Sequence, residues 1–281
     1  MKRVVGSLLL LPLTLLSSET KEYDGYSYFS FGMQNIKYEE NIVLNNGQHV
    51  HSSAHATSPV YISGSLIRVN EKFDFSIDLL STLLPSETDE HWYLDESFVQ
   101  QNKFDAIISH MQFLGHYKLN NNHRIVFGPI YSLNSYKRYT FKDQNGNDIV
   151  DSDTGAKIGL LEERVANLRL STGYWYESAP QATPNHMRYR FNALIGQTIW
   201  TQASNTGFEK VVFDSINSYE LQSSAYAGYT ILKGLEIGLF IEYSRQEKTS
   251  TDVADDGHTK WPKNTLTLYQ GGVSAVWNFS K

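Results

Sequence analysis

The sequence predicts an all-β protein, an antiparallel transmembrane β-barrel of about ten strands, and three observations support this fold class. Long stretches alternate between apolar and polar residues, the pattern of strands with one apolar and one polar face. Each stretch is about a dozen residues long, roughly twice the usual strand of a soluble domain and enough to cross a bilayer when tilted. The connections between the stretches alternate between short and long, as in barrels of this kind.

The clearest pair of strands is a predicted hairpin at residues 218–247, with its turn at Lys233-Gly234. One face of its first strand is apolar and carries Tyr219, Leu221, Ala225, Ala227, Tyr229 and Ile231. The apolar face of its second strand carries Leu235, Ile237, Leu239, Ile241 and Tyr243. The intervening residues are polar or small, so we expect one face toward lipid and one toward the barrel interior.

The same alternation recurs along the chain. It predicts strands at residues 23–38, 59–69, 72–83, 104–119, 123–141, 159–176, 187–202, 218–232, 235–247 and 264–279. The shorter connections are 70–71, 120–122, 177–186 and 233–234, and the longer ones are 39–58, 84–103, 142–158, 203–217 and 248–263. A further hairpin hidden in 39–58 or 203–217 would raise the count to twelve.

Composition narrows the function classes. The chain of 281 residues has no cysteine, which excludes disulfides, zinc–thiolate sites and thiol nucleophiles. The charged start Met1-Lys2-Arg3 and the apolar run 4–16 predict a signal peptide at residues 1–18, followed by one barrel domain at 19–281. Removal of the signal peptide takes two positive charges away and changes the net charge from -6 to -8. Nucleic acid is therefore not an expected partner. A soluble β-sandwich or lipocalin-like barrel is the alternative that the strand length and the signal peptide disfavour.

The last predicted strand ends on alternating apolar residues, Val273, Ala275, Trp277 and Phe279, followed by Ser280-Lys281. This ending resembles the C-terminal assembly signal of Gram-negative outer-membrane β-barrel proteins. The resemblance implies short periplasmic turns, long extracellular loops and both termini in the periplasm. It also implies a monomer in the cell outer membrane, with outer-membrane lipid, lipopolysaccharide and the outer-membrane assembly machinery as partners. At the level of architecture the chain is also similar to solitary autotransporter-type barrels and to the omptin proteases, whose paired Asp and Asp-His motifs it lacks.

The inward faces of the predicted strands carry charges of both signs. The predicted lumen charge network consists of Asp74, Asp78, His110, Arg124, Arg169, Arg188, Arg190, Glu220, Glu236 and Glu242. In a narrow barrel these side chains either fill the lumen as a plug of salt bridges or line a narrow selective conduit. Because isolated charges there would be costly, we expect Arg188 and Arg190 to pair with carboxylates across the lumen.

Three further sets of residues suggest binding. Asp143, Asn145, Asn147 and Asp151 match part of a calcium-loop spacing, with the glycine and the final glutamate missing. His49, His51 and His55 are close enough in sequence to share a metal ion. Basic residues at the long-loop ends of the strands are placed to meet lipopolysaccharide phosphates, and they are Lys103, Lys137, Arg138, Lys142, Arg164, Arg245, Lys248, Lys260 and Lys263. No cofactor is expected.

Aromatic residues near the same strand ends predict an outer girdle, which includes Tyr38, Trp92, Tyr93, Tyr136, Tyr139, Trp200, Tyr243 and Trp261. The leading functional hypothesis is a non-enzymatic barrel with a filled or narrow lumen that acts through its extracellular loops or as a small-solute, porin-like channel. The alternative is an outer-membrane hydrolase, a protease or a lipid-modifying enzyme, with its site at the loop end.

Overall fold

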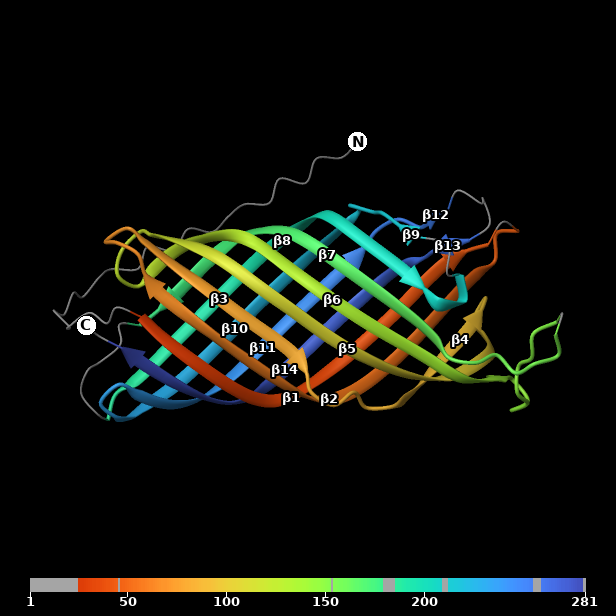
Figure 1. Cartoon of the computed structure of the whole chain (residues 1–281), viewed down its shortest axis with the longest axis horizontal. Helices are drawn as coiled ribbons and strands as arrows, with labels where there is room; N and C mark the ends of the chain where they lie inside the picture. Colours follow the sequence, from red (N-terminus) through yellow and green to blue (C-terminus); the bar gives the residue numbers. More distant parts are fainter. Residues whose placement is uncertain are drawn as a thin grey trace.

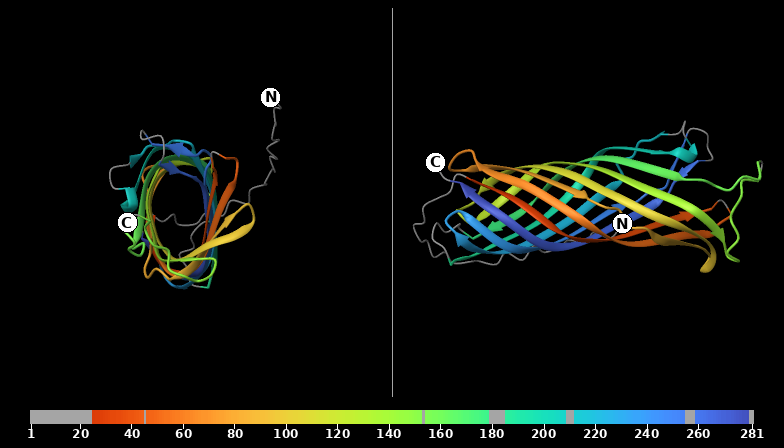
Figure 2. Two further views of the ribbon diagram at one scale, coloured as in Figure 1. Left: turned by 90° about the vertical axis from the view of Figure 1, so that its right-hand side faces the viewer. Right: turned by 60° about the horizontal axis from the view of Figure 1, so that its bottom comes forward.

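The computed structural model describes residues 25–44, 46–152, 154–178, 185–208, 212–254 and 259–279, and in them ten long strands form one closed antiparallel ring (Figures 1 and 2). The strands are β1 (Gly25–Val43), β2 (His49–Arg68), β3 (Phe73–Thr82), β5 (Ser97–Lys118), β6 (His123–Asp143), β7 (Leu161–Glu177), β8 (Met187–Asn205), β10 (Ser218–Leu232), β11 (Leu235–Lys248) and β14 (Lys263–Phe279). The ring closes where β1 pairs with β14, from Gly25 opposite Phe279 to Asn41 opposite Lys263. The predicted fold class is confirmed. The predicted signal peptide at residues 1–18 lies outside the described residues.

The two ends of the barrel differ. At one end, called here the short-turn end, strands are joined by tight turns such as Lys233-Gly234, and both Gly25 and Phe279 lie there. At the other, the loop end, the chain adds four short strands, β4 (Thr88–Leu94), β9 (Val212–Phe213), β12 (Asp252–Val253) and β13 (Lys260–Trp261), and the 3-10 turn η1 (Thr206–Phe208). Figure 1 shows these elements gathered at the right-hand end. Among the described residues no helix has the length and apolarity needed to cross a bilayer.

Two segments predicted as long loops are strands, so those two predictions are wrong. Residues 39–58 continue β1 and begin β2, and only residues 44–48 turn between them. Residues 84–103 contain β4, which continues the line of β3 between β2 and β5, and the first residues of β5. Asp95 and Glu96 connect β4 to β5 with φ of 45° and 69°, the positive values that a tight two-residue hairpin turn requires. The ring therefore holds ten strands, and β4 and β9 do not add positions to it.

The outer surface carries an apolar band that begins at the short-turn end. It is defined by exposed side chains from all ten strands: Phe29, Phe31, Met33, Ile67, Phe73, Leu79, Tyr117, Ile125, Phe127, Tyr131, Leu133, Leu170, Tyr174, Tyr189, Phe191, Ile195, Ile199, Trp200, Leu221, Tyr229, Ile231, Ile237, Leu239, Ile241, Tyr269, Val273, Trp277 and Phe279. This apolar band is what a barrel presents to lipid hydrocarbon. The exposed faces of β10 and β11, the hairpin predicted at residues 218–247, agree with the predicted orientation.

The strands continue past the apolar band, and their polarity then reverses. In β1 the outward residues Phe31 and Met33 give way to Lys37 and Glu39, while inward positions become apolar at Ile36. In β14 the outward residues change in the same way, from Val273 and Tyr269 to Thr265 and Lys263. Apolar outside and polar inside suits lipid, whereas polar outside and apolar inside suits water. The barrel therefore has two sections, the apolar band and a water-facing section toward the loop end.

The interior of the water-facing section is a hydrophobic core. It is formed by Ile36, Tyr38, Ala54, Ala56, Val60, Ile62, Leu80, Phe104, Ala106, Ile108, Tyr136, Val165, Ala203, Trp261, Leu266 and Leu268. Eight of the ten ring strands contribute to it, together with β13, so side chains from opposite walls meet across the barrel. This core separates the polar interior of the apolar band from the loop end.

Candidate functional site

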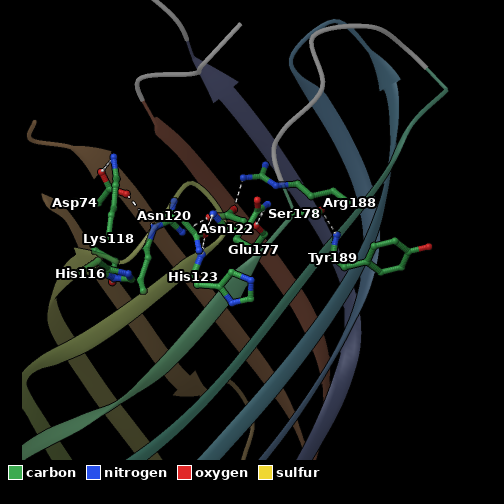
Figure 3. Close-up of polar contacts among 12 residues, drawn as sticks. Asp74, His116, Lys118, Asn120, Asn122, His123, Glu177, Ser178, Arg188 and Tyr189 are labelled. Carbon is green, nitrogen blue, oxygen red and sulfur yellow. Dashed lines mark hydrogen bonds and ion pairs between the residues drawn. The ribbon is translucent and has the colours of Figure 1, made fainter. Parts of the chain in front are cut away.

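Ion pairs fill the interior at the short-turn end. Arg124 lies between Asp74 at 3.1 Å and Glu177 at 2.7 Å, and Lys118 adds a contact of 2.8 Å to Asp74. Arg188 pairs with the same Glu177 and donates to Glu236 at 2.8 Å, as Figure 3 shows in part. Three acidic and three basic groups thus balance in charge, and all are nearly fully buried. The structure brings Asp74, Arg124, Arg188 and Glu236 of the predicted lumen network together here, and Lys118 and Glu177 are partners that the sequence analysis did not include.

The remaining predicted lumen residues lie in the middle of the barrel. Arg169 lies 2.7 Å from Glu220, and Asp78 accepts a hydrogen bond of 2.6 Å from Tyr28. Glu242 accepts one from Gln222, which in turn is joined across the lumen to Gln112. The predicted carboxylate partner of Arg190 is replaced by aromatic rings. Its guanidinium lies 4.0 Å, 4.7 Å and 5.5 Å from the ring centres of Tyr226, Tyr26 and Tyr28.

A small cavity of about 80 Å³ lies among these central residues, and His110, Asp78, Arg190 and Glu242 line it. Its walls belong to the barrel interior within the apolar band. The ion pairs lie on its short-turn side and the hydrophobic core on its loop side. The predicted lumen residues therefore belong to a filled interior in two polar layers.

A second polar cluster lies at the loop end, past the apolar band, and we call it the mouth cluster: Glu40, Glu90, Arg138 and Glu163. Arg138 donates to Glu90 and to Glu40 at 2.7 Å each, and lies 3.5 Å from Glu163. The four residues come from four strands, β1, β4, β6 and β7, and all are buried. The Arg138 guanidinium also lies within 5.7 Å of the ring centres of Tyr38, Trp92 and Phe104. The fold, not local sequence, assembles this cluster.

The carboxylates of the mouth cluster differ in their partners. Glu90 also accepts hydrogen bonds from Ser52 at 3.0 Å and Asn102 at 2.9 Å. Burial by itself raises the pKa of Glu90, but the ion pair with Arg138 outweighs burial and holds this pKa below its usual range. Burial raises the pKa of Glu163 to about 7, the charge of Glu40 adds to the rise, and Arg138 opposes it. At neutral pH one carboxyl of the cluster is thus charged and well paired, and another is poised between its two forms.

A cavity of about 380 Å³ opens beside the mouth cluster, and we call it the mouth cavity. Its floor includes Glu40, Arg138 and Glu163. Its walls are mainly aromatic and aliphatic, and they are Trp92, Phe141, Ile158, Leu161, Ala203, Phe213, Trp261 and Pro262. The carboxyl oxygen Oε1 of Glu163 and the indole Nε1 of Trp261 are both buried and make no well-formed hydrogen bond among the described residues. The indole nevertheless lies close enough to the Glu163 carboxyl to oppose the rise in its pKa. Apolar walls with a few convergent polar groups are typical of small-molecule sites.

The mouth cluster corrects several predictions made from the sequence. Tyr38, Tyr136 and Trp261 are buried in the interior and do not belong to an outer girdle. Arg138 and Lys248 are likewise buried, so they do not face lipopolysaccharide. Each of these lies in the water-facing section, where the inward face is the buried one. The reversal of polarity along strands such as β1 and β6 is the sequence signal that would have placed them correctly.

The candidate calcium residues lie in the loop after β6. The carboxylate of Asp143 accepts the backbone N–H groups of Asn145 and Asn147 at 2.8 Å and 2.9 Å, an Asx turn that closes the loop. Asp151 likewise accepts the N–H of Thr154. His49, His51 and His55, expected in a loop, belong to β2. Across the described residues no group of three or more His, Cys, Asp or Glu side chains is arranged to hold a metal ion.

Comparison with known proteins supports the fold. No family model matches the chain, and no curated protein matches it. Among solved structures, the outer membrane protease OmpT from Escherichia coli is similar, with a TM-score of 0.60, 10% identity, and coverage of 94% of this chain and 100% of that chain. The translocator domain of the autotransporter NalP from Neisseria meningitidis gives a TM-score of 0.36, with 9% identity and coverage of 91% and 88%. A Pseudomonas aeruginosa FadL homologue gives 0.30, with 11% identity and coverage of 91% and 90%. The protein thus has the fold of outer-membrane β-barrels.

Proposed function

We propose that the protein is an outer-membrane barrel closed to solutes, which binds a ligand from outside the cell in the mouth cavity. The apolar band supports a membrane location, because a protein in water rarely exposes so large a ring of apolar side chains, whereas a membrane barrel buries it in lipid. The water-facing section then projects from the outer leaflet, with the short-turn end and both chain ends in the periplasm. Outward basic residues such as Lys137 and Lys263, just past the band, would meet lipopolysaccharide phosphates.

The filled interior supports the first half of the proposal, that the barrel is closed to solutes. A solute crossing the barrel would meet the balanced ion pairs around Arg124 and Arg188, and then the hydrophobic core. Opening the first layer would break buried ion pairs, which costs about 3–5 kcal/mol for each uncompensated charge. Opening the second would hydrate a packed apolar core. These costs favour a closed barrel over a porin-like channel.

The mouth cavity supports the second half of the proposal, that the protein binds a ligand at its loop end. It is the larger of the two cavities described above, it opens at the end that faces outward in the proposed orientation, and it joins apolar walls to buried polar groups. Its volume of about 380 Å³ lies within the range of small-molecule sites, about 300–1,000 Å³. Binding at the mouth requires no passage through the lumen.

Planar-bilayer recording of the refolded mature chain tests the closed barrel, once heat-modifiable migration in detergent shows that the barrel has formed. We expect insertion without steady single-channel conductance. A steady, ion-selective conductance would overturn the closed barrel and favour a small channel lined by the central polar residues. The ligand half of the proposal is tested separately by binding measurements.

A hydrolase at the same end is the second candidate function, and one observation favours it. Glu90 and Glu163 share Arg138, yet one has a lowered pKa and the other a pKa of about 7. Carboxyl groups whose pKa values are pushed apart are suited to acid and base roles. Turnover of a bound compound by the wild type, lost in Glu163→Gln, would support hydrolysis. Stoichiometric binding without turnover would support the binding function.

A further inference from the structure

The mouth cluster has more negative than positive charge. Three carboxylates, Glu40, Glu90 and Glu163, surround the single guanidinium of Arg138. If all three are ionised the cluster carries a net charge of -2. Burying charge without compensation is costly, so a cluster of this composition either retains a proton or gains a cation.

The other charged groups near Glu163 do not remove this excess. Lys248 of β11 is neutralised by Asp252 at 2.9 Å and donates to the Trp261 carbonyl. Lys260 of β13 lines the cavity and has an interaction of its own. Counted together, these three groups reduce the excess by one charge, and among the described residues the surroundings of Glu163 stay negative. The short-turn ion pairs, by contrast, balance fully.

Glu163 faces open space as well as protein. Only one of its two carboxyl oxygens is near Arg138, at 3.5 Å. The other makes no well-formed hydrogen bond, although the Trp261 indole lies close enough to the carboxyl to oppose the rise in its pKa. The residue lines the mouth cavity, where Trp92, Phe141, Phe213 and Trp261 supply aromatic walls. Ring faces attract cations, and aromatic walls also bury hydrocarbon. A positive head group beside Glu163, attached to an apolar body, would satisfy both the excess charge and the walls.

We propose that the mouth cavity binds an organic cation with an apolar body, an amine or guanidinium compound whose charged head pairs with Glu163. The proposal rests on the ligand-binding function proposed above and names the class of ligand. The carboxylate form of Glu163 makes the pair, while Arg138 continues to hold Glu40 and Glu90.

The pH dependence of binding follows from this pairing. The pKa of Glu163 is raised to about 7 in the free protein, by burial first and by Glu40 next. Below that pH a cation must displace the proton, so its affinity falls as the pH falls. Between pH 8 and pH 6 the expected loss is about tenfold. A neutral ligand of the same shape does not show this loss.

Calorimetric titration of the full mature chain in detergent tests the proposal, with tryptamine as the cationic probe and tryptophol as its neutral counterpart. We expect the wild type to bind tryptamine at least about tenfold more tightly than tryptophol at pH 8. Glu163→Gln keeps the size of the side chain and resembles its neutral form, so it should fold normally. It should abolish both the preference for tryptamine and the pH dependence. The matched control is Glu162→Gln, whose side chain faces outward beside Arg164 and should leave binding unchanged.

The outcomes separate this inference from the proposed function. Equal binding of tryptamine and tryptophol by the wild type would overturn the cation inference and leave the binding cavity in place. An unchanged preference in Glu163→Gln would overturn the role of Glu163. Failure of both probes to bind would overturn the cation inference together with the ligand-binding function.

Discussion

Two arginines show how the surroundings of a side chain decide its role. Arg188 contacts Glu177 and Glu236 in a network whose charges balance, and it is almost fully buried. Arg138 also contacts carboxylates, but it is outnumbered three to one and borders a cavity. The first arrangement holds the wall strands together. The second leaves a carboxyl group available to a ligand.

At the residue scale, we predict that Arg188→Met is strongly destabilising. It would leave Glu177 short of one partner and Glu236 without its cation, both buried, at a cost of about 3–5 kcal/mol. The measurement is the free energy of unfolding of the refolded barrel in detergent, from urea titration.

The control is Arg245→Met, which breaks an exposed pair with Glu247 and should cost less than about 1 kcal/mol. Equal effects of the two substitutions would mean that the short-turn ion pairs add no more than a surface pair does.

At the scale of the element, the outward face of a long strand such as β11 changes from apolar to polar along its length. The half of β11 nearest the short-turn end presents Ile237, Leu239 and Ile241 outward, and its other half presents Arg245 and Glu247. The period of two continues through the change, and in β1 the inward face becomes apolar at Ile36 and Tyr38 where the outward face becomes polar. A strand of this kind is longer than the bilayer requires, and its extra length builds the water-facing section.

We predict that Leu239→Arg costs about 2–4 kcal/mol, because this side chain is 65% exposed near the middle of the apolar band. The same substitution at Thr265 is the control. Thr265 faces outward past the band, between Glu39 and Glu247 on the neighbouring strands, where an arginine should be nearly neutral. The free energy of unfolding of both variants in the same detergent gives the comparison. An unchanged free energy of unfolding for Leu239→Arg would mean that this face of β11 does not contact lipid.

At the scale of the whole molecule, side chains fill the barrel interior, and the mouth cavity lies in the water-facing section. The polar interior of the barrel and its hydrophobic core are stacked along one axis, and the loop-end elements lie beyond them (Figure 1). Rigid strands, rather than loops, position Glu40, Arg138 and Glu163, which favours a binding site of fixed geometry.

The absence of cysteine from the chain permits a direct test of this arrangement with single-cysteine variants. Lys37→Cys and Phe31→Cys both face outward on β1, the first past the apolar band and the second within it. In intact cells a membrane-impermeant maleimide should label the first and not the second. Labelling of Lys37→Cys only after cell disruption would contradict the proposed orientation. Equal labelling of both variants would mean that the apolar band does not lie in the membrane.

The sequence alone determined the fold class, the strand count and the faces of most strands, because a period of two is a local property of neighbouring residues. It also found which charged residues point inward, including Arg124, Arg188 and Glu236. It failed at residues 39–58 and 84–103, where polar composition was interpreted as loop. In the water-facing section a strand can have a polar outward face, so polar composition no longer distinguishes a strand from a loop.

The tertiary structure alone decided which inward groups meet. Glu40, Glu90, Arg138 and Glu163 are separated by up to 123 positions in sequence, and their contacts depend on the closure and register of the ring. Alternation predicts that a side chain points inward, but it contains no information on its neighbours across the barrel. The charge excess and the cavity at the mouth arise from those neighbours, since both depend on the distances between strands that only the closed barrel fixes.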